Sequence, residues 1–297
     1  MKVSVIISSY NYEKFVLDAV KSVLNQSYSD IETIFVDDGS SDNTVKLVRS
    51  LSSRIVIIEK RNGGQLSAFN AAFPYINGDI VFFIDADDIY GRDYIKNAVD
   101  FYISHEDADF VFSGINYFGT ADRRNVVRIT KCFGFTLCQA WYFKSWIGAA
   151  TSAISMRIDI LNKILPLDIE SDWRVRADDC LVWGASLVGA KKYSLADNAV
   201  NYRVHGNNCH YGKGFDAGYL FRRSLAINRL FGLLAAKNQI VIDHEVVRFE
   251  YLSQPDRNLR KLILYFRIIF KTEESLLKKL ISSAKIARLF FKRMKGL

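Results

Sequence analysis

Residues 79 to 88 read Asp-Ile-Val-Phe-Phe-Ile-Asp-Ala-Asp-Asp. Their β-branched and aromatic run predicts a strand buried on both faces, and the carboxylates of Asp85, Asp87 and Asp88 come at its C-terminal end. In open α/β sheets, ligands bind outside the carboxyl ends of the strands. Clustered carboxylate oxygens without His or Cys suit a Mg²⁺ or Mn²⁺ ion that holds a phosphate. The stretch therefore predicts an α/β sheet with a metal-bound phosphorylated ligand at this strand end.

The first 115 residues alternate short apolar runs with helical patterns, which predicts repeated βαβ units and a mostly parallel sheet. Strands are expected at 3–8, 31–36, 54–59, 79–85, 150–156 and 191–195. Helices are expected at 15–25, around 45–48, at 66–73 and at 180–188.

A second acidic pair, Asp37-Asp38, ends the second predicted strand, and Gly39-Ser40 follows it. Taken alone, this pair could cap the next helix. Two acidic clusters at neighbouring strand ends repel one another, however, and need a cation or a donor-rich ligand. Together they favour a binding site over two separate helix caps.

The composition is that of a globular protein of 297 residues, with a formal net charge of +8. Much of the positive excess lies after residue 220, and strand signals end near residue 215. We therefore expect one domain over residues 1–214 and a basic helical extension over 215–297, with helices at 220–236, 258–270 and 275–295. The last two helices interleave Lys and Arg with apolar residues, which fits either an anionic membrane surface or a helix packed on the domain with a solvated basic face.

The four cysteines include no Cys-x-x-Cys pair, and Cys209-His210 is a lone neighbouring pair, so free thiols are favoured over a zinc site. No signal peptide and no run of about 18 apolar residues is evident. The expected location is the cytoplasm, on the inner face of the cell membrane if the basic helices bind lipid. No nucleic-acid partner is expected.

Four motifs occur in a specific order. They are Val-Ser-Val-Ile-Ile-Ser-Ser-Tyr-Asn at 3–11, Val-Asp-Asp-Gly-Ser-Ser-Asp-Asn-Thr at 36–44, Asn-Gly-Gly-Gln at 62–65 with Asn70, and Phe-Ile-Asp-Ala-Asp-Asp at 83–88. Over about the first 210 residues the chain resembles an inverting glycosyltransferase of family 2. The resemblance implies the GT-A fold, which is a Rossmann-like, mostly parallel sheet flanked by helices.

The resemblance also implies a nucleotide-sugar donor, with UDP favoured, and a divalent metal, Mn²⁺ or Mg²⁺, at the diphosphate. The implied nucleotide contacts are Ser9, Tyr10, Asp37, Asp38, Gln65, Asn70 and Asp85. Asp87 is the implied metal ligand, supported by Asp85. In the downstream segment 201–208, His205 is either a metal ligand or a phosphate donor, and Arg203 would offset phosphate charge.

Inversion needs a general base for the acceptor hydroxyl. In the resembling family that carboxylate ends an acidic pair at a helix start, which assigns the base to Asp179 and a sugar or acceptor contact to Asp178. The structural alternative is an acidic helix N-terminus favoured by the dipole. No Gln-x-x-Arg-Trp segment follows the pair, so single transfer to a glycan or lipid-linked acceptor of the cell envelope is favoured over a processive synthase. The aromatic-rich stretch 117–146 fits either an acceptor groove or core packing.

Three rival functions stay open. A GT-A module without turnover would keep the binding motifs. A sugar nucleotidyltransferase would carry a Gly-rich loop after the first strand, where the chain has Ser8-Ser9-Tyr10. An Asp-nucleophile phosphatase would place its Asp-x-Asp pair after the first strand.

Overall fold

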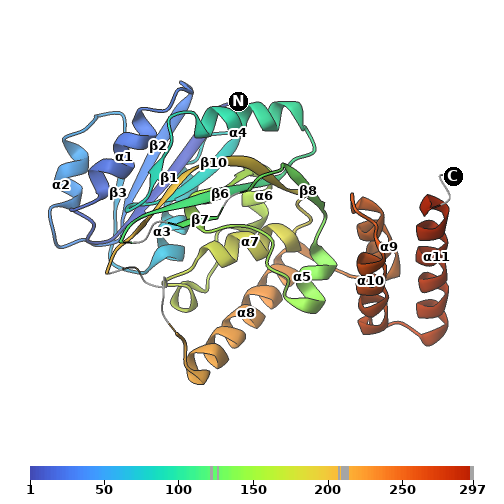
Figure 1. Cartoon of the computed structure of the whole chain (residues 1–297). Helices are drawn as coiled ribbons and strands as arrows, with labels where there is room; N and C mark the ends of the chain where they lie inside the picture. Colours follow the sequence, from blue (N-terminus) through green and yellow to red (C-terminus); the bar gives the residue numbers. More distant parts are fainter. Residues whose placement is uncertain (121–122, 126, 207, 209–213, 295–297) are drawn as a thin grey trace.

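The computed structural model describes residues 1–120, 123–125, 127–206, 208 and 214–294 (Figure 1). Its N-terminal part alternates strands and helices as expected. The elements are β1 (Val3–Ser9), α1 (Val16–Leu24), β2 (Ile31–Asp37), α2 (Thr44–Arg49), β3 (Val56–Glu59), α3 (Gln65–Ala72), η1 (Phe73–Tyr75) and β4 (Ile80–Asp85). The strand expected from Arg54 begins only at Val56, because the chain turns over residues 53–54.

The middle of the chain holds more elements than its sequence pattern predicts. They are β5 (Ile89–Tyr90), α4 (Tyr94–Ser104), β6 (Phe110–Gly119), β7 (Arg123–Asn125), β8 (Lys131–Gly134), α5 (Leu137–Phe143), η2 (Thr151–Ala153), β9 (Ile154–Arg157), α6 (Ile158–Ile164), η3 (Glu170–Asp172), α7 (Asp178–Leu187) and β10 (Lys192–Val204). The strand expected over 150–156 is half 3₁₀ turn, and the strand expected over 191–195 continues to Val204 along β6.

One ten-stranded sheet organises this part, in the order β3-β2-β1-β4-β9-β6-β10-β5, with β7 and β8 paired at its margin. Strands β3, β2, β1 and β4 are parallel, as expected, whereas β9 is antiparallel to both β4 and β6. The register pairs Ser9 with Asp37 and Ser8 with Asp85. The acidic ends of β2 and β4 therefore flank the end of β1.

Both faces of the sheet are covered, which explains the continuous apolar runs of the central strands. Alternation along β1 sends Val5 and Ile7 into one core, with α1 and α4, and Ile6 into the other, with α3, α6 and α7. Most aromatic side chains of the 117–146 stretch are half-buried and pack against the apolar cores; Trp141, for example, packs on Phe231 with ring centroids 6.0 Å apart. Phe135 and Trp146 are its exposed members.

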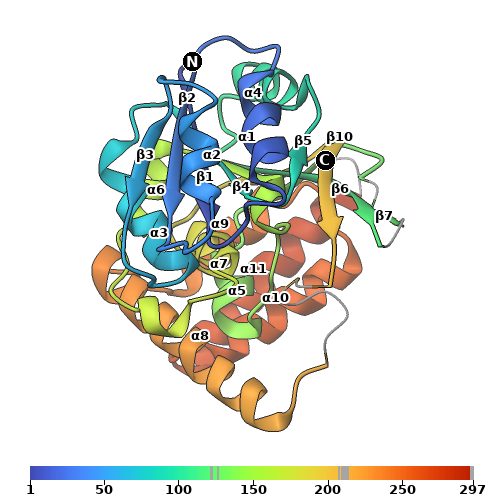
Figure 2. The same ribbon diagram turned by 90° about the vertical axis from the view of Figure 1, so that its left-hand side faces the viewer.

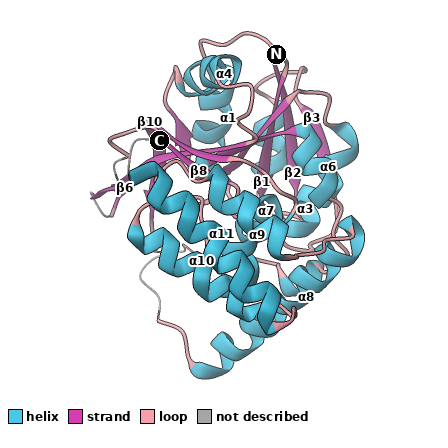
Figure 3. Cartoon of the chain, turned by 90° about the vertical axis from the view of Figure 1, so that its right-hand side faces the viewer, coloured by secondary structure: helices cyan, strands magenta, loops and turns pink. Residues whose placement is uncertain are grey.

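The helical extension has two parts (Figures 1 and 3). Helix α8 (Ala217–Asn238) contributes Ala226, Leu230, Phe231 and Leu234 to the core beneath the sheet. Helices α9 (His244–Ser253), α10 (Leu259–Lys271) and α11 (Leu276–Met294) form a separate apolar cluster with Cys138 of α5. The sequence pattern did not predict α9. The domain boundary expected between residues 214 and 215 stays a prediction. Helix α8 lies after this boundary but packs with the residues before it.

Cys132, Cys138 and Cys180 are free thiols. Cys209 and His210 lie outside the described residues, as does Asn207. Within the part that is described, no helix is both long and apolar enough to span a bilayer.

Candidate active site

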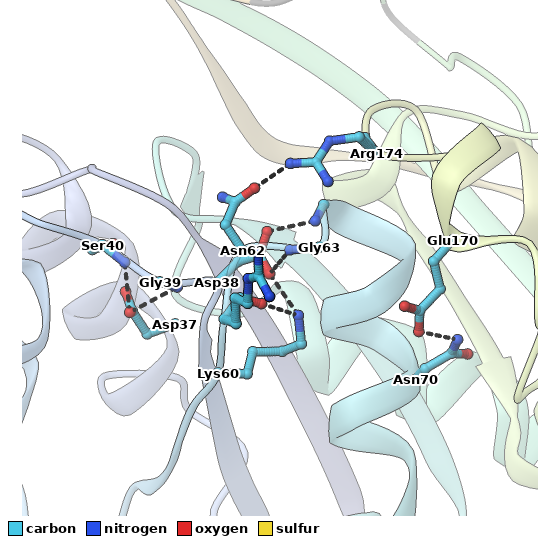
Figure 4. A network of polar contacts seen from close by, with 12 residues as sticks. Asp37, Asp38, Gly39, Ser40, Lys60, Asn62, Gly63, Asn70, Glu170 and Arg174 are labelled. Atoms are coloured by element: carbon cyan, nitrogen blue, oxygen red, sulfur yellow. Dashed lines mark hydrogen bonds and ion pairs between the residues drawn. The ribbon is translucent and has the colours of Figure 1, made fainter.

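Asp38 connects the end of β2 to the turn that begins α3 (Figure 4). Its Oδ1 accepts hydrogen bonds from Lys60 Nζ and the Gly63 N–H, both at 2.8 Å, and its Oδ2 accepts one from the Gly64 N–H at 2.6 Å. The carboxylate is buried. Asp38, one of the implied nucleotide contacts, therefore holds the 62–65 turn against the sheet.

Asp37 keeps one oxygen free on the same edge. Its Oδ2 accepts from the N–H groups of Gly39 (3.1 Å) and Ser40 (2.8 Å), which closes the turn after β2 (Figure 4). Its buried Oδ1 and the buried Oγ of the neighbouring Ser9 have no partner within the described structure. Tyr10 is 47% exposed beside them. Buried polar atoms without partners are costly, so this edge has unused capacity for hydrogen bonds to a polar ligand.

Gln65 joins the end of β4 to the start of α7. Its Nε2 donates to Asp85 Oδ1 at 2.8 Å and to Thr151 Oγ1 at 3.2 Å, while its Oε1 accepts from the Ala177 N–H at 2.8 Å. Burial and then the charges of Asp87 and Asp178 raise the pKa of Asp85 to about 8. Two acidic segments that are far apart in the sequence thus meet at Asp85.

Asp87, which follows β4, and His205, which follows β10, lie close together. His205 Nε2 lies 2.9 Å from Asp87 Oδ2, and both side chains are largely buried. Arg203 donates from Nε to the Asp87 carbonyl and from Nη2 to Asp18 Oδ2, and its guanidinium lies 4.8 Å from the ring centroid of Phe15 and 4.7 Å from that of Phe118. Asp87, the implied metal ligand, therefore lies beside both His205 and Arg203. The guanidinium of Arg203 already donates hydrogen bonds to protein acceptors.

Asp88 has a structural position. Its fully buried carboxylate accepts from Ser152 Oγ at 2.5 Å and from the Arg203 N–H at 2.9 Å, which ties β4 to η2 and β10. Burial, Asp87 and Asp85 raise the pKa of Asp88 well above its ordinary value. Ser152 and Thr151 were missed by sequence analysis, because no local pattern marks their approach to β4.

Asp178 and Asp179 begin α7 but differ in environment. Asp178 is partly exposed, and burial raises its pKa to about 6 although Arg176 and Arg223 oppose the rise. Asp179 is fully buried, with Arg176 Nε 3.4 Å from its Oδ2 and Arg223 in a closer ion pair. Arg223 comes from α8, and nothing in the local sequence pointed to it. The two guanidiniums favour the ionised form of Asp179.

Asn70 does not face this cluster. Its amide nitrogen donates to Glu170 Oε1 (Figure 4) and to the Leu167 carbonyl, and its oxygen accepts from the Leu167 N–H. With the whole amide engaged, Asn70 holds the 167–170 segment. The nucleotide contact expected for Asn70 stays a prediction.

A divalent metal fits the donor set in part. Asp85 and Asp87 supply hard oxygens at one strand end, and their mutual repulsion is the kind that a cation relieves. Across the described residues, however, no group of three His, Cys, Asp or Glu converges on one point. Such a site suits an ion that keeps waters and takes its remaining ligands from a diphosphate.

Comparisons with known proteins identify the family of the chain. The model of the family described as Glycosyl transferase family 2 matches residues 4–165, more than half of the 297-residue chain. The chain belongs to glycosyl transferase family 2. An uncharacterized glycosyltransferase of Nostoc sp. is 33% identical to this family member over 221 residues, which cover 71% of the chain and 67% of that protein.

A second relative is the poly(ribitol-phosphate) beta-N-acetylglucosaminyltransferase TarS of Staphylococcus aureus, 32% identical over 111 residues. That match covers 35% of this glycosyltransferase and 19% of TarS. The crystal structure of S. aureus TarS 1–349 in complex with UDP-GlcNAc matches with a TM-score of 0.59 and 20% identity, over 97% of this chain and 72% of that one. The predicted GT-A fold is confirmed, and the chain is a glycosyltransferase.

Proposed function

We propose that this family 2 enzyme is an inverting glycosyltransferase that moves one sugar from a UDP-sugar to a hydroxyl of a glycan or lipid-linked acceptor. The observation that carries the proposal is the position of Asp85. Gln65 holds it, and its charge interacts with both Asp87 and Asp178. The strand end suited to a diphosphate and the acidic start of α7 therefore border one reaction space. UDP is favoured because the TarS structures contain UDP or UDP-GlcNAc.

The donor side of the proposed site is the edge formed by β1, β2 and β4. Ser9 Oγ can donate or accept a hydrogen bond with the nucleoside, and Asp37 Oδ1 can accept one. Tyr10 is exposed beside them. Asp38 shapes this edge through the 62–65 turn. Asp87, with Asp85 and His205 beside it, would hold Mn²⁺ or Mg²⁺, which when bound neutralises charge on the departing diphosphate.

The acceptor side is the start of α7. We propose Asp179 as the general base, because two guanidiniums keep it ionised, and Asp178, which is more accessible, as the contact to a sugar or acceptor hydroxyl. The hydroxyl oxygen forms the new bond to the anomeric carbon and gives its proton to the carboxylate. The bond from that carbon to the diphosphate breaks, and the diphosphate leaves with the electron pair. Attack opposite the leaving group inverts the anomeric configuration.

The C-terminal helices carry the proposed membrane contact. The buried stripe of α10 and α11 includes Tyr265, Ile269 and Ile286, yet each helix has a second apolar stripe that is exposed. Its members are Leu259, Ile263, Phe270, Leu276, Leu277, Leu280, Ile281 and Phe291, each 47% exposed or more. Exposed basic residues lie among them, namely Arg260, Arg267, Lys271, Lys278, Lys285 and Arg288. Apolar and basic groups together fit the anionic cytoplasmic leaflet, where a lipid-linked acceptor would be within reach.

The test of the enzymatic proposal combines ligand-induced stabilisation with transfer. UDP with Mn²⁺ should raise the melting temperature of the wild type, and Asp87→Ala should lose the metal-dependent part of that rise. Donor consumption in the presence of a glycan acceptor should fall by at least a hundredfold in Asp179→Asn. Nucleotide stabilisation should persist in this variant, because Asp179 lies outside the donor edge.

Two results would contradict the proposal. Equal stabilisation of wild type and Asp87→Ala by UDP with Mn²⁺ would remove the metal assignment. Nucleotide binding without donor consumption, unchanged in Asp179→Asn, would indicate a GT-A module that binds the sugar nucleotide and does not turn it over.

A further inference from the structure

Helix α8 reaches the acidic pair of α7 from the C-terminal extension (Figures 1 and 2). Arg223, near its start, forms an ion pair with Asp179, and its guanidinium lies 5.3 Å from the ring of the buried Trp173. Arg229, further along the helix, donates from Nε and Nη2 to the two carboxylate oxygens of Asp172 at 2.6 and 2.5 Å. The buried residues of α8 fix the same helix against α7. The backbone of Arg223 is thus fixed by the packing of α8, and its guanidinium by the contact with the Trp173 ring.

Two guanidiniums and a second carboxyl surround Asp179 at the start of α7. Arg176 and Arg223 pair with its carboxylate, and its own N–H donates to Asp178 Oδ1 at 3.1 Å. Arg176 has a left-handed backbone, with φ of 61°, which a non-glycine residue rarely adopts. Burial and then the neighbouring Arg176 lower the pKa of Arg223 to about 10. Two like charges are therefore brought close to one another around the fully buried carboxylate of Asp179, and both also act on the neighbouring Asp178.

We propose that Arg223 is a positioning residue that holds the proposed base, Asp179, ionised and in place, so that the helical extension takes part in the acid–base chemistry. The inference rests on the proposed function. A buried carboxylate beside another carboxylate would otherwise take up a proton, and a protonated carboxyl cannot accept one from the acceptor hydroxyl. Arg223 does not itself touch the reacting atoms in this role. It acts through Asp179, with Arg176 as the second cation.

The sign of the expected effect follows from the charge that is removed. In Arg223→Gln, the buried Asp179 loses one of two cations and keeps Asp178 as a neighbour, so its pKa rises. The acidic limb of the pH profile of kcat should move to higher pH by about one unit or more. At pH values well below the limb, the rate of the variant should fall further below wild type than it does at pH 8.5, by about tenfold for each unit by which the limb moves. Arg223→Lys retains the charge and should keep the limb within about 0.3 of the wild-type position.

Arg222→Gln is the matched control, because Arg222 is the exposed neighbour on the same helix turn. Its pH profile should coincide with that of the wild type. An unshifted acidic limb in Arg223→Gln, with only a uniform fall in rate, would overturn the inference and leave Arg223 a packing residue. The proposed function would survive that result.

A second measurement needs no activity. Melting temperatures of wild type, Arg223→Gln, Asp179→Asn and the double variant are compared at pH 5 and pH 8. The loss in Arg223→Gln should be larger at pH 8, where an unpaired Asp179 is charged, and the double variant should recover most of it. If Arg223→Gln fails to fold but the double variant folds, this result also supports the ion pair. Equal losses at both pH values, or a double variant as unstable as the sum of the two single ones, would overturn it. If wild type transfers no sugar, the proposed function fails, and this cycle still decides whether Arg223 controls Asp179.

Discussion

At the scale of single residues, Gly64 explains how the donor edge meets the start of α7. It has φ of 92°, its N–H donates to Asp38, and the following Gln65 N–H donates to the Arg174 carbonyl at 2.8 Å. A Cβ at this position would overlap the Cα of Arg174. The 62–65 turn can therefore lie against residue 174 only because residue 64 has no side chain.

Gly64→Ala should destabilise the protein by about 3 kcal/mol or more, because it combines a positive-φ extended backbone (φ 92°, ψ 178°), which is essentially limited to glycine, with a steric overlap. Gly189→Ala is the control, since Gly189 has φ of 79° with nothing within 4 Å of the added Cβ. It carries only the backbone strain, and its expected loss is about 1 to 2 kcal/mol. Urea unfolding of both variants measures the difference. Equal losses would mean that the contact with Arg174 is not tight.

At the scale of elements, Glu250 of α9 fastens the C-terminal helices to the domain. Its buried carboxylate accepts from the N–H groups of Cys138 (2.6 Å) and Gln139 (3.3 Å) at the start of α5, and from Tyr265 Oη of α10 at 2.8 Å. Burial raises the pKa of Glu250, while these hydrogen bonds work against the rise. One side chain thus joins three helices.

Glu250→Ala leaves two backbone N–H groups and one hydroxyl without an acceptor, and we expect it to destabilise the α9–α11 cluster by about 3 kcal/mol. Hydrogen exchange followed by mass spectrometry should show lost protection in α9, α10 and α11, with β1, β2 and β4 unaffected. Glu273→Ala, at an exposed position, is the control. Lost protection throughout the sheet would contradict the separation of the two apolar clusters.

The sequence predicts features that depend on neighbouring residues, but not those that depend on contacts between distant segments. Buried strands such as 80–85, and the acidic residues that end them, are visible in a short window of sequence, and the structure has them where they were expected. The ion pair of Arg223 with Asp179 and the contact of Ser152 with Asp88 depend on how distant segments pack. Asn70 shows the converse, because a polar residue in a motif can be fully used by a neighbouring loop.

At the scale of the whole molecule, the sheet and the α9–α11 cluster lie side by side (Figure 1). The cluster has an exposed apolar stripe besides its buried core. A second copy of the chain could cover apolar side chains equally well, but it would not use the basic residues between them. Exposed Lys278, Lys285 and Arg288 of α11 favour an anionic surface instead. Each basic residue near such a surface contributes about 1 kcal/mol at low ionic strength.

We therefore expect the full chain to float with vesicles that contain phosphatidylglycerol, to bind phosphatidylcholine vesicles far more weakly, and to be released by salt. Leu277→Glu with Ile281→Glu should abolish flotation, because both side chains are exposed on α11 and would place charge in the acyl boundary. Ile103→Glu, on the exposed face of α4, should leave binding unchanged. A chain that stays unbound to anionic vesicles, yet forms a dimer that Leu277→Glu with Ile281→Glu dissociates, would assign the stripe to a second copy. Binding equal for both vesicle types and insensitive to salt would show that the basic residues take no part.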